Sequence, residues 1–235
     1  MRGDAAPLAP HEFWQEVYPA GRFDAAPTGG FRHLYPAALP DGRQIALPIR
    51  VLPGDGSRAV ASLILNQASF AVEDALAAPL AAMARDADPQ IIVAVPTLGL
   101  SLAANVARRL GHSRLVPLGT SRKFWYDEAL SEPIASITTQ QTRRVYLDPR
   151  MLSLVEGRRV AVVDDVVSTG RSMAAVLGLL ARAGVRPVAV LAAMLQGSGG
   201  PAHIAARTGW RGPLLSAIPS PLLARNPDGG WDPIR

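Results

Sequence analysis

The chain has 235 residues, a formal net charge of +5 and 49% hydrophobic residues, enough for one large domain, or one domain with a small appendage, around a substantial core. It contains no cysteine, which excludes disulfides, a thiol nucleophile and thiolate metal sites. No apolar stretch reaches transmembrane length and the first residues lack a secretory signal, so we expect a cytoplasmic protein without a membrane partner. Its arginines are scattered, so nucleic acid binding is not expected.

The first part of the chain predicts an antiparallel β meander. Apolar segments at residues 31–39, 43–53 and 58–67 are separated by turns that contain glycine. We therefore assign residues 1–69 to a β-rich hood or appendage.

The central part has the alternation of an α/β fold. Residues 70–85 have a helical pattern, and strands and helices then alternate as far as residue 196. We assign residues 70–196 to the α/β core. Residues 197–235 contain several glycines and prolines, and we expect a loop-rich extension there.

A first candidate binding turn follows the predicted buried strand at residues 91–95. Thr97, Leu98 and Gly99 lead from that strand into a predicted helix at residues 101–110. A strand, a glycine turn and a helix occur in this order in many α/β proteins, so the pattern alone is weakly specific.

A long excursion follows the short predicted strand at residues 115–118. Arg122 and Lys123 at its start are candidates for binding an anion, with solvated surface charge as the alternative. The aromatic residues 124–126 would stack on a base or pack the loop against the sheet. We expect residues 120–141 to be the most mobile part of the core and to close over substrate.

The most informative segment is residues 159–172, with the sequence RVAVVDDVVSTGRS. Its apolar run has no polar alternation, which predicts a strand of a parallel sheet covered on both faces. Asp164 and Asp165 follow directly, and a Thr/Gly/Ser loop then opens a helix. The carboxyl end of such a strand is where α/β proteins bind ligands.

The residue types at this junction fit a phosphorylated sugar. Gly170 allows the backbone to approach an anion, Thr169 and Ser172 supply hydroxyl donors, and the following helix directs free N–H groups at the same point. Asp164 and Asp165 would repel phosphate, but they accept hydrogen bonds from sugar hydroxyls or hold a hydrated divalent cation.

The segment from Val162 to Ser172 resembles the ribose-phosphate signature of type I phosphoribosyltransferases. Acids at strand ends also occur in receiver domains and nucleotide hydrolases, but receivers lack the Thr-Gly-x-Ser loop and no GxxxxGK[ST] motif is present. The resemblance implies an α/β fold, with a central parallel sheet flanked by helices and a small hood made from the N-terminal and C-terminal segments.

The resemblance also implies the binding site for 5-phosphoribosyl 1-pyrophosphate (PRPP). Asp164 and Asp165 would hold the ribose hydroxyls, and the turn at residues 97–99 would receive the pyrophosphate. The segment from Pro96 to Gly99 would carry an unusual, sometimes cis, peptide. The 5′-phosphate would lie against Val167, Ser168, Thr169, Gly170, Arg171 and Ser172.

The implied reaction is transfer of the phosphoribosyl group to a nitrogenous base with release of pyrophosphate. Arg122, Lys123 and Asp165 would be catalytic, with Mg²⁺ as cofactor, held indirectly by Asp164 and Asp165. We expect a purine acceptor, adenine before xanthine or guanine, because Ser168 stands where 6-oxopurine enzymes often have an acid. We also expect a homodimer.

Two other functions remain open. A regulator that senses PRPP without turnover is favoured by the positive charge and disfavoured by the lack of an added DNA-binding helix pair. A synthase or amidotransferase-type relative would use the same sugar site with ATP or ammonia, but the absence of cysteine argues against a fused glutaminase.

Overall fold

The computed structural model describes residues 8–134 and 143–234. Its core is a five-stranded sheet with strand order β10-β9-β8-β4-β5, in which all neighbours are parallel. The strands are β4 (Ile91–Ala94), β5 (Val116–Pro117), β8 (Val160–Val167), β9 (Ala189–Gln196) and β10 (Leu214–Ser220). The predicted α/β class and central parallel sheet are confirmed.

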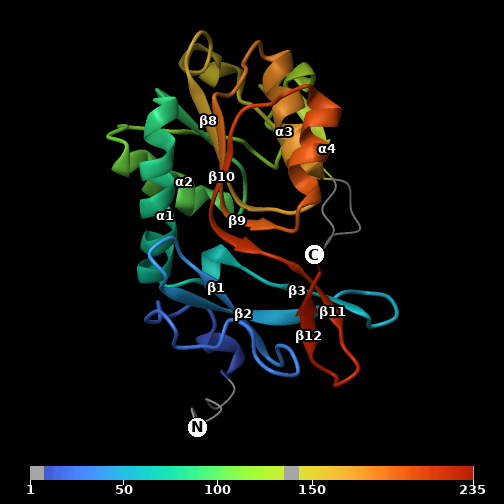
Figure 1. Ribbon diagram of the computed structural model, residues 1–235. Helices are drawn as coiled ribbons and strands as arrows, with labels where there is room; N and C mark the ends of the chain where they lie inside the picture. Colours follow the sequence, from blue (N-terminus) through green and yellow to red (C-terminus); the bar gives the residue numbers. More distant parts are fainter. Residues whose placement is uncertain (1–7, 135–142, 235) are drawn as a thin grey trace.

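Helices cover both faces of this sheet (Figure 1). One face carries α1 (Phe70–Ala84) and α2 (Gly99–Arg109), and the other carries α3 (Arg171–Arg182) and α4 (Gly199–Thr208). Short 3₁₀ turns lie at η1 (Pro10–Glu12), η2 (Leu65–Gln67), η3 (Arg85–Ala87), η4 (Glu128–Leu130) and η5 (Pro149–Leu154). Within the described residues, no helix is both long and apolar enough to cross a bilayer.

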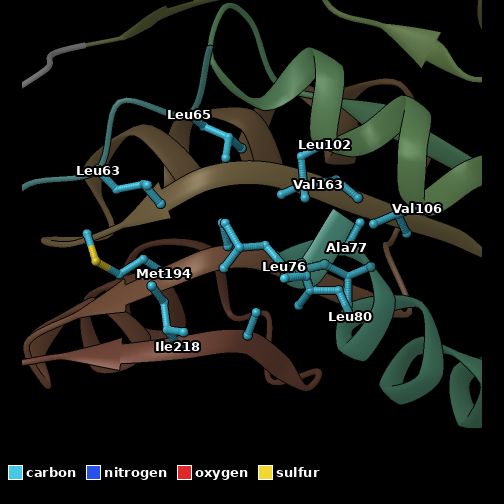
Figure 2. Close-up of a cluster of buried hydrophobic side chains, with 14 of the residues drawn as sticks. Leu63, Leu65, Leu76, Ala77, Leu80, Leu102, Val106, Val163, Met194 and Ile218 are labelled. Carbon is cyan, nitrogen blue, oxygen red and sulfur yellow. The ribbon is translucent and has the colours of Figure 1, made fainter. Parts of the chain in front are cut away.

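Side-chain alternation along β8 explains why its sequence is apolar throughout. Val163 packs with Leu76 and Leu102 on the α1 and α2 side (Figure 2), whereas Val162 belongs to the cluster under α3. Successive residues of a strand point to opposite faces, so a strand covered on both faces needs apolar residues at every position.

A second five-stranded sheet forms the hood, with strand order β1-β2-β3-β11-β12. The predicted meander is confirmed, because β1, β2 and β3 pair antiparallel in sequence order. The C-terminal strands β11 and β12 extend the same sheet, so strands from the first and the last parts of the chain share one sheet (Figure 1). The strands are β1 (Leu34–Ala38), β2 (Gln44–Val51), β3 (Arg58–Ala61), β11 (Leu222–Arg225) and β12 (Trp231–Pro233).

The expectation of a loop-rich tail after residue 196 is wrong. This segment contains α4, β10, β11 and β12, and β10 belongs to the core sheet. Pro219 is compatible with β10 because β10 is an edge strand, where one side of the backbone needs no ladder hydrogen bonds. The division into segments 1–69, 70–196 and 197–235 stays a prediction.

The hood sheet curves, so that the segment before its first strand reaches its last strand. Phe31 bridges Trp231 on β12, while the N–H of Ile49 on β2 donates to the carbonyl of His33. The segment that leads into β1 therefore contacts both β2 and the last strand of the sheet. Phe31 and Trp231 pack with Ala59 and Leu223 in a small apolar cluster.

The hood adjoins the carboxyl edge of the core sheet. β10 ends at Ser220 and β11 begins at Leu222, so one residue separates a core strand from a hood strand. Gln196, at the end of β9, donates from Nε2 to the carbonyl oxygen of Ala61 on β3 at 2.8 Å, and this contact is buried. The edge where ligands bind in α/β proteins is thus the edge next to the hood.

Replacing Gln196 with leucine should lower the free energy of unfolding. The substitution removes the donor and leaves the buried Ala61 carbonyl without this partner, which costs about 1–3 kcal/mol. Gln67→Leu, at an exposed position, is the matched control and should change stability by less than about 0.5 kcal/mol. Urea denaturation checks this, and equal effects of the two variants would contradict the proposed link between hood and core.

Candidate active site

The acid pair lies on the central strand, where the neighbouring strand stops. β8 does not end at the acids, as the sequence suggested, but continues through Asp164 and Asp165 to Val167. On one side Asp164 pairs with Ala192 of β9, while on the other β4 ends at Ala94, opposite Val163. The acids therefore extend past β4 at the carboxyl edge.

This position is a topological switch point of the sheet. The chain leaves β4 into α2 on one face, and it leaves the adjacent β8 into α3 on the opposite face (Figure 1). Connections that diverge in this way open a crevice between the two strand ends, and open α/β sheets bind their ligands there.

Burial makes the acid pair electrostatically unusual. Asp164 is 6% exposed, and its burial raises the pKa of its carboxyl well above the usual range, with the Asp165 charge adding to the effect. Burial also raises the pKa of Asp165. The N–H of Asp165 donates to Oδ1 of Asp164 at 2.9 Å. Two adjacent carboxyls in a buried site favour retention of a proton, which hydroxyl donors or a cation would replace.

The predicted phosphate loop turns tightly between β8 and α3. Gly170 has φ +77° and precedes the first residue of α3. A Cβ at Gly170 would lie 2.5 Å from the carbonyl oxygen of Gly200 in α4, and a Cβ at Gly200 would lie 2.5 Å from that of Ser168. Glycine is therefore required at both positions, because a side chain at either would prevent the loop from packing against the start of α4. Helix α3 begins directly after the loop.

The turn at residues 97–99 contacts the acid pair directly. A Cβ added to Gly99 would lie 2.9 Å from Cα of Asp164, so no larger residue fits without a backbone shift. The peptide between Pro96 and Thr97 is cis, as the family resemblance implied for this turn. The fold thus places the turn at residues 97–99, which is weakly specific as a sequence pattern, in contact with the acid pair, which belongs to the most specific motif of the chain.

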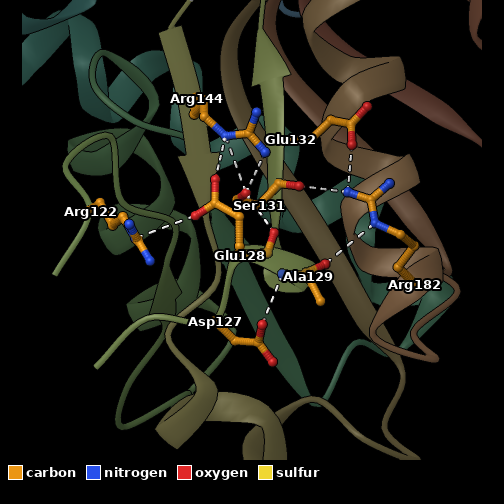
Figure 3. A network of polar contacts seen from close by, with 8 residues as sticks. All are labelled: Arg122, Asp127, Glu128, Ala129, Ser131, Glu132, Arg144 and Arg182. Carbon is orange, nitrogen blue, oxygen red and sulfur yellow. Dashed lines mark hydrogen bonds and ion pairs between the residues drawn. The ribbon is translucent and has the colours of Figure 1, made fainter. Parts of the chain in front are cut away.

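Arg122 and Lys123 follow the end of β5, which lies next to β4, so both are on the carboxyl edge of the sheet. The Arg122 guanidinium pairs with Glu128, Nε to Oε2 at 3.3 Å (Figure 3). Lys123 is exposed, and it is the only lysine of the chain. The other basic residues of the chain are nearly all arginine. A single lysine at this position is therefore a signal in the sequence that a search for motifs does not detect.

Two of the three aromatic residues of this loop, Trp125 and Tyr126, contact the rest of the protein, whereas Phe124 is 97% exposed. The Trp125 indole N–H donates to Oδ2 of Asp148 at 3.3 Å, and the Arg150 guanidinium lies 4.5 Å from a ring centroid of Trp125. Tyr126 packs on the ring of Tyr146.

Asp148 is the structural residue of this loop that sequence analysis missed. Hydrogen bonds from Arg150 lower the pKa of the Asp148 carboxyl to about 2. Its carboxylate also accepts the backbone N–H of Arg150 in the first turn of η5, so one buried acid joins the aromatic loop to the segment before β8. Only the three-dimensional contact with Trp125 distinguishes it from other acids that precede a proline.

The described part of the excursion after β5 has a regular structure. It continues into β6 (Ser131–Ile134), which pairs antiparallel with β7 (Arg143–Tyr146). Arg182 of α3 donates to the carbonyl of Ser131 and pairs with Glu132, which fastens this hairpin to the core (Figure 3). Residues 135–141 of the predicted closing loop lie outside the described residues, and closure stays a prediction.

The acid pair fits an indirectly held divalent cation. Among the described residues, no group of three or more His, Cys, Asp or Glu side chains could enclose a metal. Mg²⁺ is commonly bound by one or two carboxylates together with substrate oxygens and water. Asp164 and Asp165 are two carboxylates of this kind, and they would hold the cation through water or through the oxygens of a bound molecule.

Comparison with known proteins assigns the family. The model of the phosphoribosyl transferase domain matches residues 64–207. The chain belongs to this family. The matched region runs from η2 to α4 and includes both candidate binding turns and the acid pair.

Two curated relatives cover part of the chain. A hypoxanthine/guanine phosphoribosyltransferase of Methanosalsum zhilinae is 31% identical over 114 residues, which is 48% of this chain and 56% of that protein. A transcriptional regulator of Archaeoglobus fulgidus, GfcR, is 35% identical over 86 residues, 37% of each chain. The chain thus matches about half of the first relative and just over a third of the second.

Solved structures support the fold of this chain. The adenine phosphoribosyltransferase of Giardia lamblia, in complex with 9-deazaadenine, aligns with a TM-score of 0.54 at 22% identity, over 66% of this chain and 82% of that one. The corresponding enzyme of Rhodothermus marinus aligns with a TM-score of 0.51 at 20% identity, over 73% and 93%. At these identities the likeness concerns the fold.

Replacing Asp164 with asparagine should stabilise the ligand-free protein at neutral pH. A carboxyl whose pKa is raised by folding favours the folded state only at low pH, and this contribution is lost as the pH rises above the ordinary value of 3.8. Asparagine has no proton to lose, and its amide still offers an oxygen to the Asp165 N–H. The gain over wild type should therefore grow from about pH 4 to 8.

Urea denaturation across this pH range checks the expectation. Asp41→Asn is the control, because the pKa of the exposed Asp41 carboxyl is lowered by the backbone N–H of Arg43, which gives the opposite sign. A pH-independent difference between Asp164→Asn and wild type would show that the acid is not held protonated.

Proposed function

We propose that this protein transfers the 5-phosphoribosyl group from PRPP to a nitrogenous base, preferentially a purine, and releases pyrophosphate. The observation that carries the proposal is the close approach of Gly99 to Asp164, since it joins both candidate binding turns at one acid pair. The family supports phosphoribosyl chemistry, and the names of the purine phosphoribosyltransferases among its relatives and structural neighbours support a purine acceptor.

Each part of the site has a role in this reaction. Asp164 and Asp165 accept hydrogen bonds from the ribose hydroxyls, which fixes the sugar relative to the sheet. The loop from Val167 to Ser172 binds the 5′-phosphate at the start of α3. The turn of Thr97, Leu98 and Gly99 binds the pyrophosphate, on the other side of the acid pair.

The transferred carbon passes through an oxocarbenium-like state, which requires orientation of the acceptor nitrogen and stabilisation of the leaving group. Arg122 and Lys123 supply positive charge at the edge where pyrophosphate departs, and Asp165 faces the developing positive charge of the sugar. Mg²⁺, when bound, neutralises pyrophosphate oxygens. No covalent nucleophile is needed, in keeping with a chain that lacks cysteine.

The direct test is product formation. The protein is incubated with PRPP, Mg²⁺ and adenine, hypoxanthine, guanine or xanthine in turn, and the nucleotide and pyrophosphate are quantified. Formation of a nucleoside monophosphate with equimolar pyrophosphate supports the proposal. The expected homodimer and cytoplasmic location stay predictions.

A non-catalytic PRPP sensor is the second candidate, because one partial relative is named a transcriptional regulator. The same experiment separates the two functions. Binding of PRPP without a nucleotide product from any base would favour the sensor.

Asp164→Asn and Asp165→Asn should each lower kcat/KM for PRPP by about 10- to 150-fold. This corresponds to the loss of a hydrogen bond to a charged group, about 1.5–3 kcal/mol. Asp88→Asn is the matched control, because Asp88 precedes β4 at the opposite edge and its left-handed backbone, φ +41°, suits asparagine. Steady-state kinetics with folded variants measure the effect, and wild-type kcat/KM in both variants would refute the ribose assignment.

Lys123→Ala should lower kcat more than it weakens PRPP binding. Its proposed partner is the charge that develops on departing pyrophosphate, which is absent from the ground state. Lys123→Arg should retain more activity, and Arg158→Ala, an exposed position before β8, should leave kcat unchanged. Turnover and PRPP affinity are measured separately, and normal turnover by Lys123→Ala would identify this lysine as surface charge.

A further inference from the structure

We infer that Glu128 is a positioning residue, whose carboxylate pairs with Arg122 until pyrophosphate binds Arg122 instead. The inference rests on the proposed function, because it assumes that Arg122 binds the pyrophosphate group. It concerns a carboxylate outside the acid pair and outside both binding turns. Figure 3 shows the residues involved.

Glu128 is shared between two arginines. Its Oε2 lies 3.3 Å from Nε of Arg122, and its Oε1 lies 3.4 Å from Nε of Arg144 (Figure 3). A carboxylate placed on a guanidinium presents the same oxygen chemistry as a phosphate group. In this arrangement the carboxylate and an incoming pyrophosphate therefore compete for Arg122.

The backbone that carries Glu128 is held in place from several sides. Asp127 accepts the N–H of Ala129 at 2.9 Å and so caps η4, while Leu130 is buried. Arg182 of α3 donates to the carbonyl of Ser131 at 2.7 Å. The carboxylate is thus presented from a fixed turn, and the arginine is the partner that can leave.

Because Arg144 also pairs with Glu128, Arg122 can leave without making the Glu128 carboxylate an unpaired charge. Arg144 donates to Ser131 Oγ from Nη2 at 2.6 Å and from Nε at 3.2 Å, so its position does not depend on Arg122. When Arg122 turns to an anion, Glu128 keeps Arg144 as its partner. The side chains of Arg122 and Glu128 are 62% and 55% exposed, and pairs this exposed are weak enough to exchange.

The consequence is a gain in affinity when the competing carboxylate is neutralised. Glu128→Gln keeps the shape and an oxygen for Arg144 but removes the charge that holds Arg122. Affinity for pyrophosphate should rise about 1.5- to 5-fold, the range of an exposed ion pair. Raising the salt concentration should reduce the gain, because exposed pairs are screened.

The experiment is a double-mutant cycle read by calorimetric titration with inorganic pyrophosphate and Mg²⁺. The four proteins are wild type, Glu128→Gln, Arg122→Ala and the double variant. The inference expects a gain from Glu128→Gln when Arg122 is present and none when it is alanine. Glu132→Gln is the matched control, because Glu132 pairs with Arg182 instead, and it should leave the affinity unchanged.

Each other outcome has a defined meaning. An equal gain in the Arg122→Ala background would show general repulsion of the anion by Glu128 and overturn the positioning role. Pyrophosphate binding that is the same in wild type and Glu128→Gln would overturn the inference alone. Absence of pyrophosphate and PRPP binding from the wild type would overturn the proposed function, and this inference with it.

Discussion

The structure around the site depends on two adjacent carboxyls near the end of the central strand, one buried and the other partly buried. Removing Asp164 and Asp165 from water is unfavourable for their charged forms, as their raised pKa values indicate. The strand that carries them is fixed by neighbours on both sides and by apolar clusters on both faces. A well-packed core thus tolerates a local arrangement that is unfavourable until a ligand supplies hydroxyls or a cation.

Close backbone contact is the second condition of the site. Gly99 meets the backbone of Asp164, and Gly170 meets that of Gly200, at distances that leave no room for a Cβ. Side chains at these points would separate the two turns from the acids and from each other. The glycines therefore define where one small, multiply charged ligand would touch three elements at once.

The sequence predicted those features that are local. The strand, acid pair, glycine loop and helix of the main motif lie within residues 159–172, so residue order alone places them together. It did not predict β10, which pairs with the preceding strand Ala189–Gln196, because the glycines and prolines of this segment suggested loops. It also missed β11, whose partner strand Arg58–Ala61 is far away in sequence. The Asp148 contacts with Trp125 were hidden for the same reason, since an isolated acid before a proline has many uses.

The carboxyl edge has two charged regions, the acid pair and the pair of Arg122 and Glu128. They differ in their exposure to water, and this difference decides how strongly each holds a partner. Asp164 is buried and Asp165 partly buried, so the interactions of the acid pair are stronger than those of exposed charges. The Arg122 and Glu128 pair is exposed and screened, so it exchanges readily. Transfer of a sugar from a leaving anion needs both kinds of contact, since the ribose has to stay fixed while the anion departs. In the proposed reaction these tasks would be divided between two elements of the fold. The end of β8 would hold the sugar, and the exposed cations after β5 would hold the leaving group.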